Sequence, residues 1–210
     1  NENRAHILAK LGRYTEAKQL LDDLFKSKDA YLVLLPDLHL NRAEMSLTQE
    51  DFQQAITSSN EAIKTGDPKS NVTVQAQYVL ALAKANTGAQ NDARKLCDES
   101  IKAASNAGDF SLQSRALLAC AEVALKGKDA PNALRLATEA QERFARGHQL
   151  ESEWRAWAIA SRASKDLGDA NKAQEQLKSE EAARAGLEQM LGSEAFKQYA
   201  LRPDIQVYYR

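Results

Sequence analysis

The sequence has few of the features that mark membrane, disulfide-stabilised or nucleic-acid-binding proteins. It contains no run of about 18 apolar residues, which a membrane-spanning helix needs, and only two cysteines, too few for a disulfide framework. Its 28 basic and 29 acidic residues give a net charge of -1, so no general field attracts nucleic acid or anionic lipid. We therefore expect neither a nucleic-acid nor a membrane partner.

Strand signals and chain breakers are scarce as well. The 210 residues include only four prolines and nine glycines, and no stretch alternates apolar and polar residues between turn signals. The abundant Ala, Leu, Gln, Glu, Lys and Arg all favour helix. We predict an all-α chain, long enough for one sizeable domain or a short solenoid.

The groups that support catalysis or metal binding are thinly spread. His6, His39 and His148 lie far apart with no metal-ligand spacing, and the sequence has no Gly-rich phosphate loop and no nucleophile elbow. The carboxylate pairs Glu50-Asp51 and Glu180-Glu181 are expected at helix starts or on solvated faces. We predict no catalytic residues, no metal and no cofactor, and hence not an enzyme.

Four larger or reactive side chains have two interpretations each. Cys97 and Cys120 lie among apolar residues of predicted helices, and we expect two buried, reduced thiols, with a bridge between these neighbouring helices left open. Trp154 and Trp157 lie three residues apart on one predicted helix. We expect them to pack between neighbouring repeats, the alternative being that they stack on a ligand.

A pattern recurs along the chain: a helix that ends near a glycine, a short polar turn, and an alanine at a fixed offset into the next helix. Gly12 precedes the first of these alanines, Ala17, and Gly88, Gly127 and Gly168 precede the third, fourth and fifth. The recurring alanines, 38, 38, 40 and 40 residues apart, are Ala17, Ala55, Ala93, Ala133 and Ala173. Glycine can end a helix by accepting a left-handed conformation, and alanine suits a close helix crossing. The pattern predicts five helical hairpins.

The segment Gly12–Ala17, which reads G-x-Y-x-E-A, and the segment Gly168–Ala173, which reads G-D-x-x-x-A, resemble the hairpin corner of tetratricopeptide repeats. The usual period of that family is about 34 residues, so the present repeats are longer, as in extended bacterial variants. The resemblance implies a right-handed α-solenoid of about five hairpins. We expect these near residues 1–27, 36–65, 71–107, 110–146 and 149–190, with Pro36 in a first helical turn and residues 31–35 as a connector or an extra turn.

The last residues, 191–210, are predicted to form a C-terminal capping helix and tail. A helix stop at Leu191-Gly192 is followed by a new helix start. The end of a solenoid exposes an apolar face that must be covered. The residues with the character to cover it are Phe196, Tyr199, Leu201, Ile205 and Val207.

In the resembling family the first helix of each hairpin lines a concave surface, and the same positions here nominate a partner-binding groove. They are acidic early in the chain and basic late, a gradient that would orient an extended or helical segment, unless the charges are only a solvated inner face. The candidate residues are Asp37, Leu40, Glu44, Gln75, Tyr78, Leu82, Arg115, Leu118, Glu122, Arg155, Arg162 and Lys165. The family's clamp for a chaperone carboxyl terminus does not transfer, because its Lys and Asn positions carry other residues here.

These features predict a scaffold that binds a protein or peptide on its concave face, within a larger bacterial regulatory or assembly protein. The alternative is a structural spacer or self-association module, so homo-oligomerisation is left open. Because Asn1 lies inside a helix already under way, we expect the natural start of the chain to be absent. We also expect a cytoplasmic location.

Overall fold

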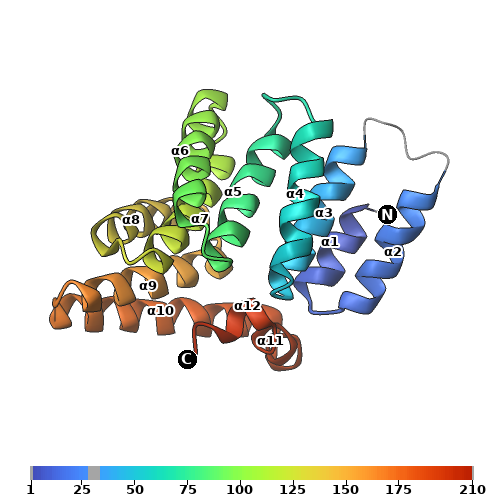
Figure 1. Ribbon diagram of the computed structural model, residues 1–210. Coiled ribbons are helices and arrows are strands. Elements are labelled where there is room, and N and C mark those ends of the chain that lie inside the picture. Colours follow the sequence, from blue (N-terminus) through green and yellow to red (C-terminus); the bar gives the residue numbers. More distant parts are fainter. Residues whose placement is uncertain (1, 28–33, 210) are drawn as a thin grey trace.

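The computed structural model describes residues 2–27 and 34–209, and every regular element in these ranges is a helix. Ten of the helices form five antiparallel hairpins that follow one another along the array (Figure 1). The pairs are α1 (Glu2–Lys10) with α2 (Tyr14–Lys26), α3 (Leu35–Thr48) with α4 (Phe52–Thr65), α5 (Asn71–Asn86) with α6 (Gln90–Ala107), α7 (Phe110–Lys126) with α8 (Ala130–Arg146), and α9 (Leu150–Asp166) with α10 (Ala170–Leu191). The predicted all-α repeat array is confirmed.

Alanines at the helix crossings explain why the hairpins close. Ala17, Ala55, Ala93 and Ala133 are completely buried, and Ala173 is buried as well. A methyl group lets two helix axes approach closely, whereas any longer side chain there would overpack the crossing. The alanine pattern read from the sequence therefore has the packing role that was predicted for it.

The hairpin corners correct one detail of the sequence prediction. The left-handed residue stands five positions before each crossing alanine, and in two corners it is not a glycine: Glu50 has φ 59° and Lys128 has φ 58°. Gly127, expected to supply the turn of the fourth hairpin, has φ -79° instead. The corner geometry is thus set by the repeat register, and glycine fills it only at Gly12, Gly88 and Gly168.

Aspartates begin several second helices at these corners. The side chains of Asp51, Asp129 and Asp169 accept hydrogen bonds from backbone N–H groups three residues later. Such caps satisfy donors that have no partner within the helix. Pro36 lies in the first turn of α3, as predicted, and Leu35 begins that helix. The other part of the expected connector, residues 31–33, lies outside the described residues.

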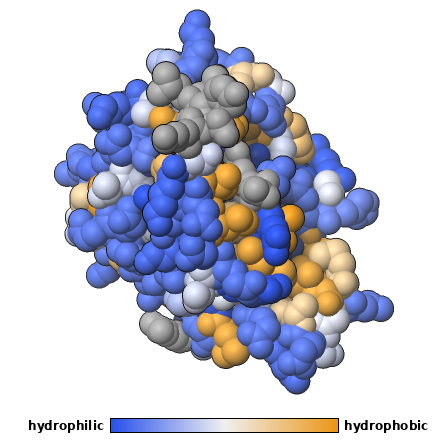
Figure 2. Space-filling view, turned by 90° about the vertical axis from the view of Figure 1, so that its right-hand side faces the viewer, coloured by the Kyte–Doolittle hydropathy of each residue, from blue (hydrophilic) through white to orange (hydrophobic). Residues whose placement is uncertain are grey.

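The apolar core is divided unevenly. Residues of α1 and α2 form a small cluster with Leu38 and Met45 of α3, while the later hairpins and the C-terminal segment share one large cluster. Figure 2 looks onto the end of the molecule that carries α1 and α2, where hydrophobic patches interrupt a mainly hydrophilic face. Ile7 of α1 is 56% exposed.

Cys97 of α6 and Cys120 of α7 are joined in a disulfide. The expectation of two reduced thiols is therefore wrong, and the alternative that was left open holds. The physical reason is proximity: α6 packs on α7, and the two Cα atoms lie 5.4 Å apart, within the range that a disulfide spans.

None of the helices in the described ranges combines the length and the hydropathy needed to cross a lipid bilayer.

The C-terminal segment turns back towards the start of the chain. After Gly192, α11 (Ser193–Ala200) and α12 (Pro203–Gln206) run beneath the array to the side of α1 and α3 (Figure 1). Of the residues expected to cover apolar surface, Tyr199 and Ile205 are buried and Phe196 and Val207 are half-buried. Leu201 is 68% exposed, so its predicted covering role is wrong. It stands in the turn between α11 and α12, on the side away from the core.

Candidate partner-binding groove

The first helices of hairpins two to five lie side by side and surround a cavity of about 730 Å³. Nine of the twelve candidate residues line it, namely Glu44, Tyr78, Leu82, Arg115, Leu118, Glu122, Arg155, Arg162 and Lys165. The helices bring these together because each repeat returns the same face of its first helix to the same side. Whether they bind a partner stays a prediction.

Three candidates lie elsewhere. Leu40 is buried in the core, so it packs between helices instead of facing a groove. Asp37 lies near the start of α3, where partial burial raises the pKa of its carboxyl group. Gln75 accepts a hydrogen bond from Arg115 at 3.2 Å, which positions that arginine from the preceding repeat.

At one end of the cavity, the C-terminal part of the chain forms the wall. We call residues 199–209 the C-terminal strap, and three of its residues, Asp204, Val207 and Tyr208, line the cavity wall. The main-chain oxygen of Val207 accepts a hydrogen bond from Arg162 at 2.9 Å. We call the part of the surface that the strap covers, formed by Glu122, Glu151, Trp154, Arg155 and Arg162, the filled half.

Tyr208 is the centre of the strap's contact with the filled half. Its ring meets Trp154 edge to face, with centroids 5.1 Å apart, and the guanidinium groups of Arg155 and Arg162 lie 5.6 and 5.3 Å from its centroid. Its hydroxyl donates to Glu122 at 3.1 Å. Aromatic, cation–π and charge-assisted contacts therefore meet on one side chain. Burial, with Glu122 next in effect, raises the pKa of the Tyr208 hydroxyl.

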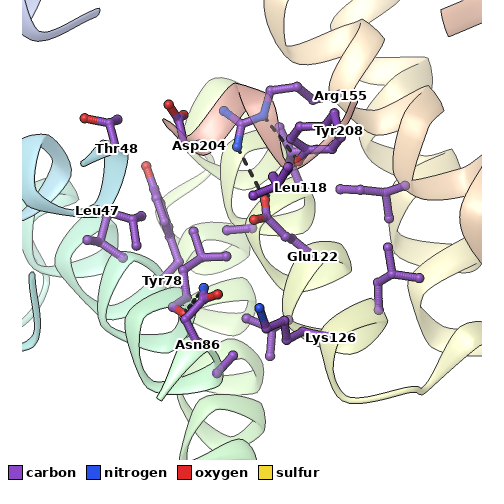
Figure 3. Close-up of a pocket in the computed structure, with 18 of the residues that line it drawn as sticks. Leu47, Thr48, Tyr78, Asn86, Leu118, Glu122, Lys126, Arg155, Asp204 and Tyr208 are labelled. Carbon is purple, nitrogen blue, oxygen red and sulfur yellow. Dashed lines mark hydrogen bonds and ion pairs between the residues drawn. The ribbon is translucent and has the colours of Figure 1, made fainter. Parts of the chain in front are cut away.

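Arg155 lies between two carboxylates. It contacts Glu122 at 3.3 Å and Glu151 at 3.5 Å, and Figure 3 shows it together with Glu122 and Tyr208. Burial alone would raise the pKa of Glu151, but Arg155, Lys10 and then Arg202 outweigh it and lower that pKa to about 2. Burial alone would lower the pKa of Arg155, yet Tyr208 and the two carboxylates raise it. Arg155 and Glu151 are therefore both ionised at neutral pH.

The strap also ties the last hairpin to the first. Arg202, only 2% exposed, forms a two-bond contact with Asp204 at 2.6 and 3.0 Å. Its remaining terminal nitrogen donates to the main-chain oxygen of Lys10, the last residue of α1, at 2.9 Å. A cation is favoured at a helix carboxyl end. The two ends of the described chain are thus joined across the concave side.

The rest of the cavity is what we call the open half, formed by Leu47, Tyr78, Leu82, Asn86, Arg115, Leu118 and Lys126. Its floor is apolar, with Tyr78, Leu82 and Leu118 nearly buried, and Arg115 and Lys126 are exposed at its margin. In Figure 3 the ring of Tyr78 stands between Leu47 on one side and Leu118 on the other. An apolar floor with polar groups at its edge is the usual build of a binding pocket.

Tyr78 is the unusual member of the open half. Its side chain is 6% exposed, but its hydroxyl is not one of the fully buried atoms that lack a partner; it reaches the cavity, and no described residue bonds it. Burial, followed by the nearby Glu44, raises the pKa of this hydroxyl, so it remains a neutral donor. A hydroxyl that reaches a cavity without a protein partner is free to bond solvent or a ligand.

Several groove residues were missed from the sequence. Glu151 lies one helical turn before Arg155, and Asn86 and Lys126 occupy one register 40 residues apart, so helical and repeat spacing would have found them. Arg202 and Tyr208 carry no such signal, because they lie outside the repeat.

Two other sequence interpretations need correction. Trp154 is buried as expected, but its ring partners are Tyr199 and Tyr208 of the strap rather than a neighbouring repeat. Glu180, expected on a solvated face, is 6% exposed, and burial raises the pKa of its carboxyl group although Arg184 lies 3.6 Å away.

The histidines do not converge. His6 contacts Glu44 at 3.1 Å, the ring of His39 lies 5.0 Å from that of Phe25 and tilted against it, and His148 occupies a turn with φ 51°. In the part of the chain that the structure describes, no three His, Cys, Asp or Glu residues gather as a metal site.

The geometry defines a helical-repeat array with a partly enclosed concave groove. Residues 1–31 match the family model described as Tetratricopeptide repeat, and the hairpin packing of the remaining chain is consistent with such a protein. No curated protein matches the chain. Tetratricopeptide repeats are general protein-interaction modules and are typically not catalytic.

Proposed function

We propose that the chain is a protein-interaction module that receives a polypeptide segment in the open half of its groove. The observation that carries the proposal is the cavity of about 730 Å³, which the Tyr78 hydroxyl reaches without a bond to any described residue. An incoming main-chain carbonyl would give that hydroxyl the acceptor it lacks.

A polypeptide suits this groove better than a compact ligand does. The neighbouring half already holds one, because the strap lies there with its main chain bonded to Arg162. The open half continues the same wall, with Arg115 in the register of Arg155, 40 residues earlier. Leu82 and Leu118 offer apolar contact to side chains of the segment, while Arg115 and Asn86 offer hydrogen bonds.

The test uses a library of displayed random peptides selected on the intact chain. Selected peptides are then measured by fluorescence anisotropy against Tyr78→Phe and Arg115→Glu, two changes in the open half, and against Arg135→Glu, an exposed position on α8. We expect the first two to weaken binding about tenfold, equivalent to one or two lost hydrogen bonds. Equal affinity for all three variants would remove the open half as the site.

A further inference from the structure

The C-terminal strap contacts the groove as a bound ligand would. One aromatic side chain, Tyr208, enters a pocket made by Trp154, Arg155 and Arg162, and its hydroxyl finds the carboxylate of Glu122. The adjoining main-chain oxygen, of Val207, is held by Arg162. Side-chain and main-chain recognition together are what a groove uses on an extended segment.

The ion pairs beneath the strap do not depend on it. Arg155 is paired with Glu122 and Glu151 by contacts that do not involve the strap. Removing the strap therefore leaves these charges with partners and returns them to water, which avoids the large cost of an unpaired buried charge. Release of the strap has a cost as well, because its residues Tyr199, Ile205 and Tyr208 belong to the large core cluster and Tyr199 accepts a hydrogen bond from Trp154 at 3.0 Å.

The segment that leads to the strap leaves the array at a glycine. Gly192 separates α10 from α11 with φ 79° and ψ 151°, a conformation open essentially to glycine alone, and a Cβ built there would meet no atom within 4 Å. No side chain packs around the glycine itself, so the contacts that hold the following segment are those of α11 and the strap.

We propose that the strap is a displaceable resident ligand, and that the filled half is a second docking site for a tyrosine-bearing segment of a partner protein. The partner's tyrosine takes the place of Tyr208 against Trp154 and Glu122, and its main-chain carbonyl takes the bond from Arg162. This goes beyond the role of the open half, which needs no movement of the strap. Displacement would also release Arg202 from Lys10 and separate the first hairpin from the last.

Competition within one chain sets the expected affinities. A tethered segment meets its site at an effective concentration in the millimolar range, so a free copy of the same sequence competes poorly. Weakening the resident strap without altering the surface beneath it removes that advantage. Tyr208→Ala does this, because Tyr208 supplies the ring and hydroxyl contacts while the pocket residues lie on α7 and α9.

The experiment measures uptake of a fluorescent synthetic peptide with the sequence of residues 193–209 by the full chain. We expect the Tyr208→Ala chain to bind it about tenfold or more tightly than the unchanged chain does. Tyr209→Ala is the matched control, since Tyr209 is exposed, and should behave as the unchanged chain. A peptide in which alanine replaces the residue corresponding to Tyr208 should lose the gain.

Two results would overturn the proposal: no gain for a folded Tyr208→Ala chain, or equal binding of the peptide with and without its tyrosine. If circular dichroism shows that Tyr208→Ala does not fold, Tyr208→Phe is used instead, with an expected gain of about threefold from loss of the bond to Glu122. Light scattering gives a further check, because a dimer formed by exchange of straps would assign the site to a second copy of this chain and contradict a separate partner.

The two proposals fail separately. Loss of peptide selection in the open half would leave the strap experiment unaffected, because its readout depends on Tyr208 and its pocket alone. A negative strap experiment would likewise leave the open half as a site.

Discussion

The two halves of the concave surface are built from the same repeat but offer different environments. Arg115 and Arg155 stand 40 residues apart in one register of the array. Arg115 is exposed and bonds only Gln75 among the described side chains, whereas Arg155 is enclosed by two carboxylates and a tyrosine ring. The strap covers Arg155 and leaves Arg115 uncovered. Register therefore decides where a side chain lies, and closure by a segment outside the repeat decides what it does.

The tyrosines show the same contrast. Tyr78 and Tyr208 are both buried and both line the cavity. The hydroxyl of Tyr208 donates to Glu122, while that of Tyr78 has no partner among the described residues. A hydroxyl with its bond made stabilises the fold, and one without it is available to a ligand.

The largest expected effect comes from the arginine pair. Arg155→Ala leaves Glu122 and Glu151 without their cation and should lower the free energy of unfolding by about 2–4 kcal/mol. Arg115→Ala should change it by less than about 0.5 kcal/mol, because that side chain is exposed. Urea denaturation of both variants measures the difference. Similar losses in the two would mean that the halves do not differ in the way described.

Acid should act on the filled half through Glu151. Its pKa is lowered from 4.5 to about 2 in the folded chain, so its contribution to stability is complete above pH 4.5 and is lost as pH falls towards 2. Because the side chain keeps some contact with water, we expect a loss of about 1–2 kcal/mol.

Denaturation between pH 5 and pH 2.5 checks this, with Glu151→Gln expected to flatten the curve. Glu50→Gln, an exposed carboxylate beside the open half, should leave the curve as it is. An unchanged slope in Glu151→Gln would contradict the assignment of the acid effect to this residue.

Removing one hydroxyl from each half sharpens the contrast further. Tyr208→Phe loses a bond to a carboxylate and should destabilise the chain by about 1 kcal/mol. Tyr78→Phe loses no bond within the described residues and should be neutral or slightly stabilising. Thermal melts followed by circular dichroism measure both. A clear loss of stability in Tyr78→Phe would show that its hydroxyl has a partner in the folded chain.

The smallest effect is expected where the two halves should agree. Glu50 stands in the corner that follows α3, beside the open half, and Lys128 in the corner that follows α7, a helix that contributes to both halves; both residues have positive φ. Changing either to glycine relieves the left-handed strain and should stabilise the chain by about 0.5–1 kcal/mol. Equal gains, read as shifts of the urea midpoint, would place the difference between the halves in the groove. A gain in only one would locate it partly in the corners.

Much of the fold could be read from the sequence, and the groove only in part. The hairpins begin and end within a residue or two of the ranges expected from the sequence, because helical spacing and the recurring alanines act through local packing. Leu40 was misplaced in the groove, since an apolar residue facing the concave side and one facing a neighbouring helix look alike in sequence. Glu180 was misplaced on the surface because burial within a helix pair is not visible in a charge pattern.

By itself the sequence determined that this chain is a series of helical hairpins. That follows from periodicity, which is a property of neighbours along the chain, whereas the positions expected in the groove came from the resemblance to tetratricopeptide repeats. Only the tertiary structure decided that residues 199–209 return to the groove, that Arg202 reaches Lys10, and that Tyr78 is left without an acceptor. The physical reason is that these features depend on residues that are distant along the chain, and the spacing of the repeats does not specify which distant residues come into contact.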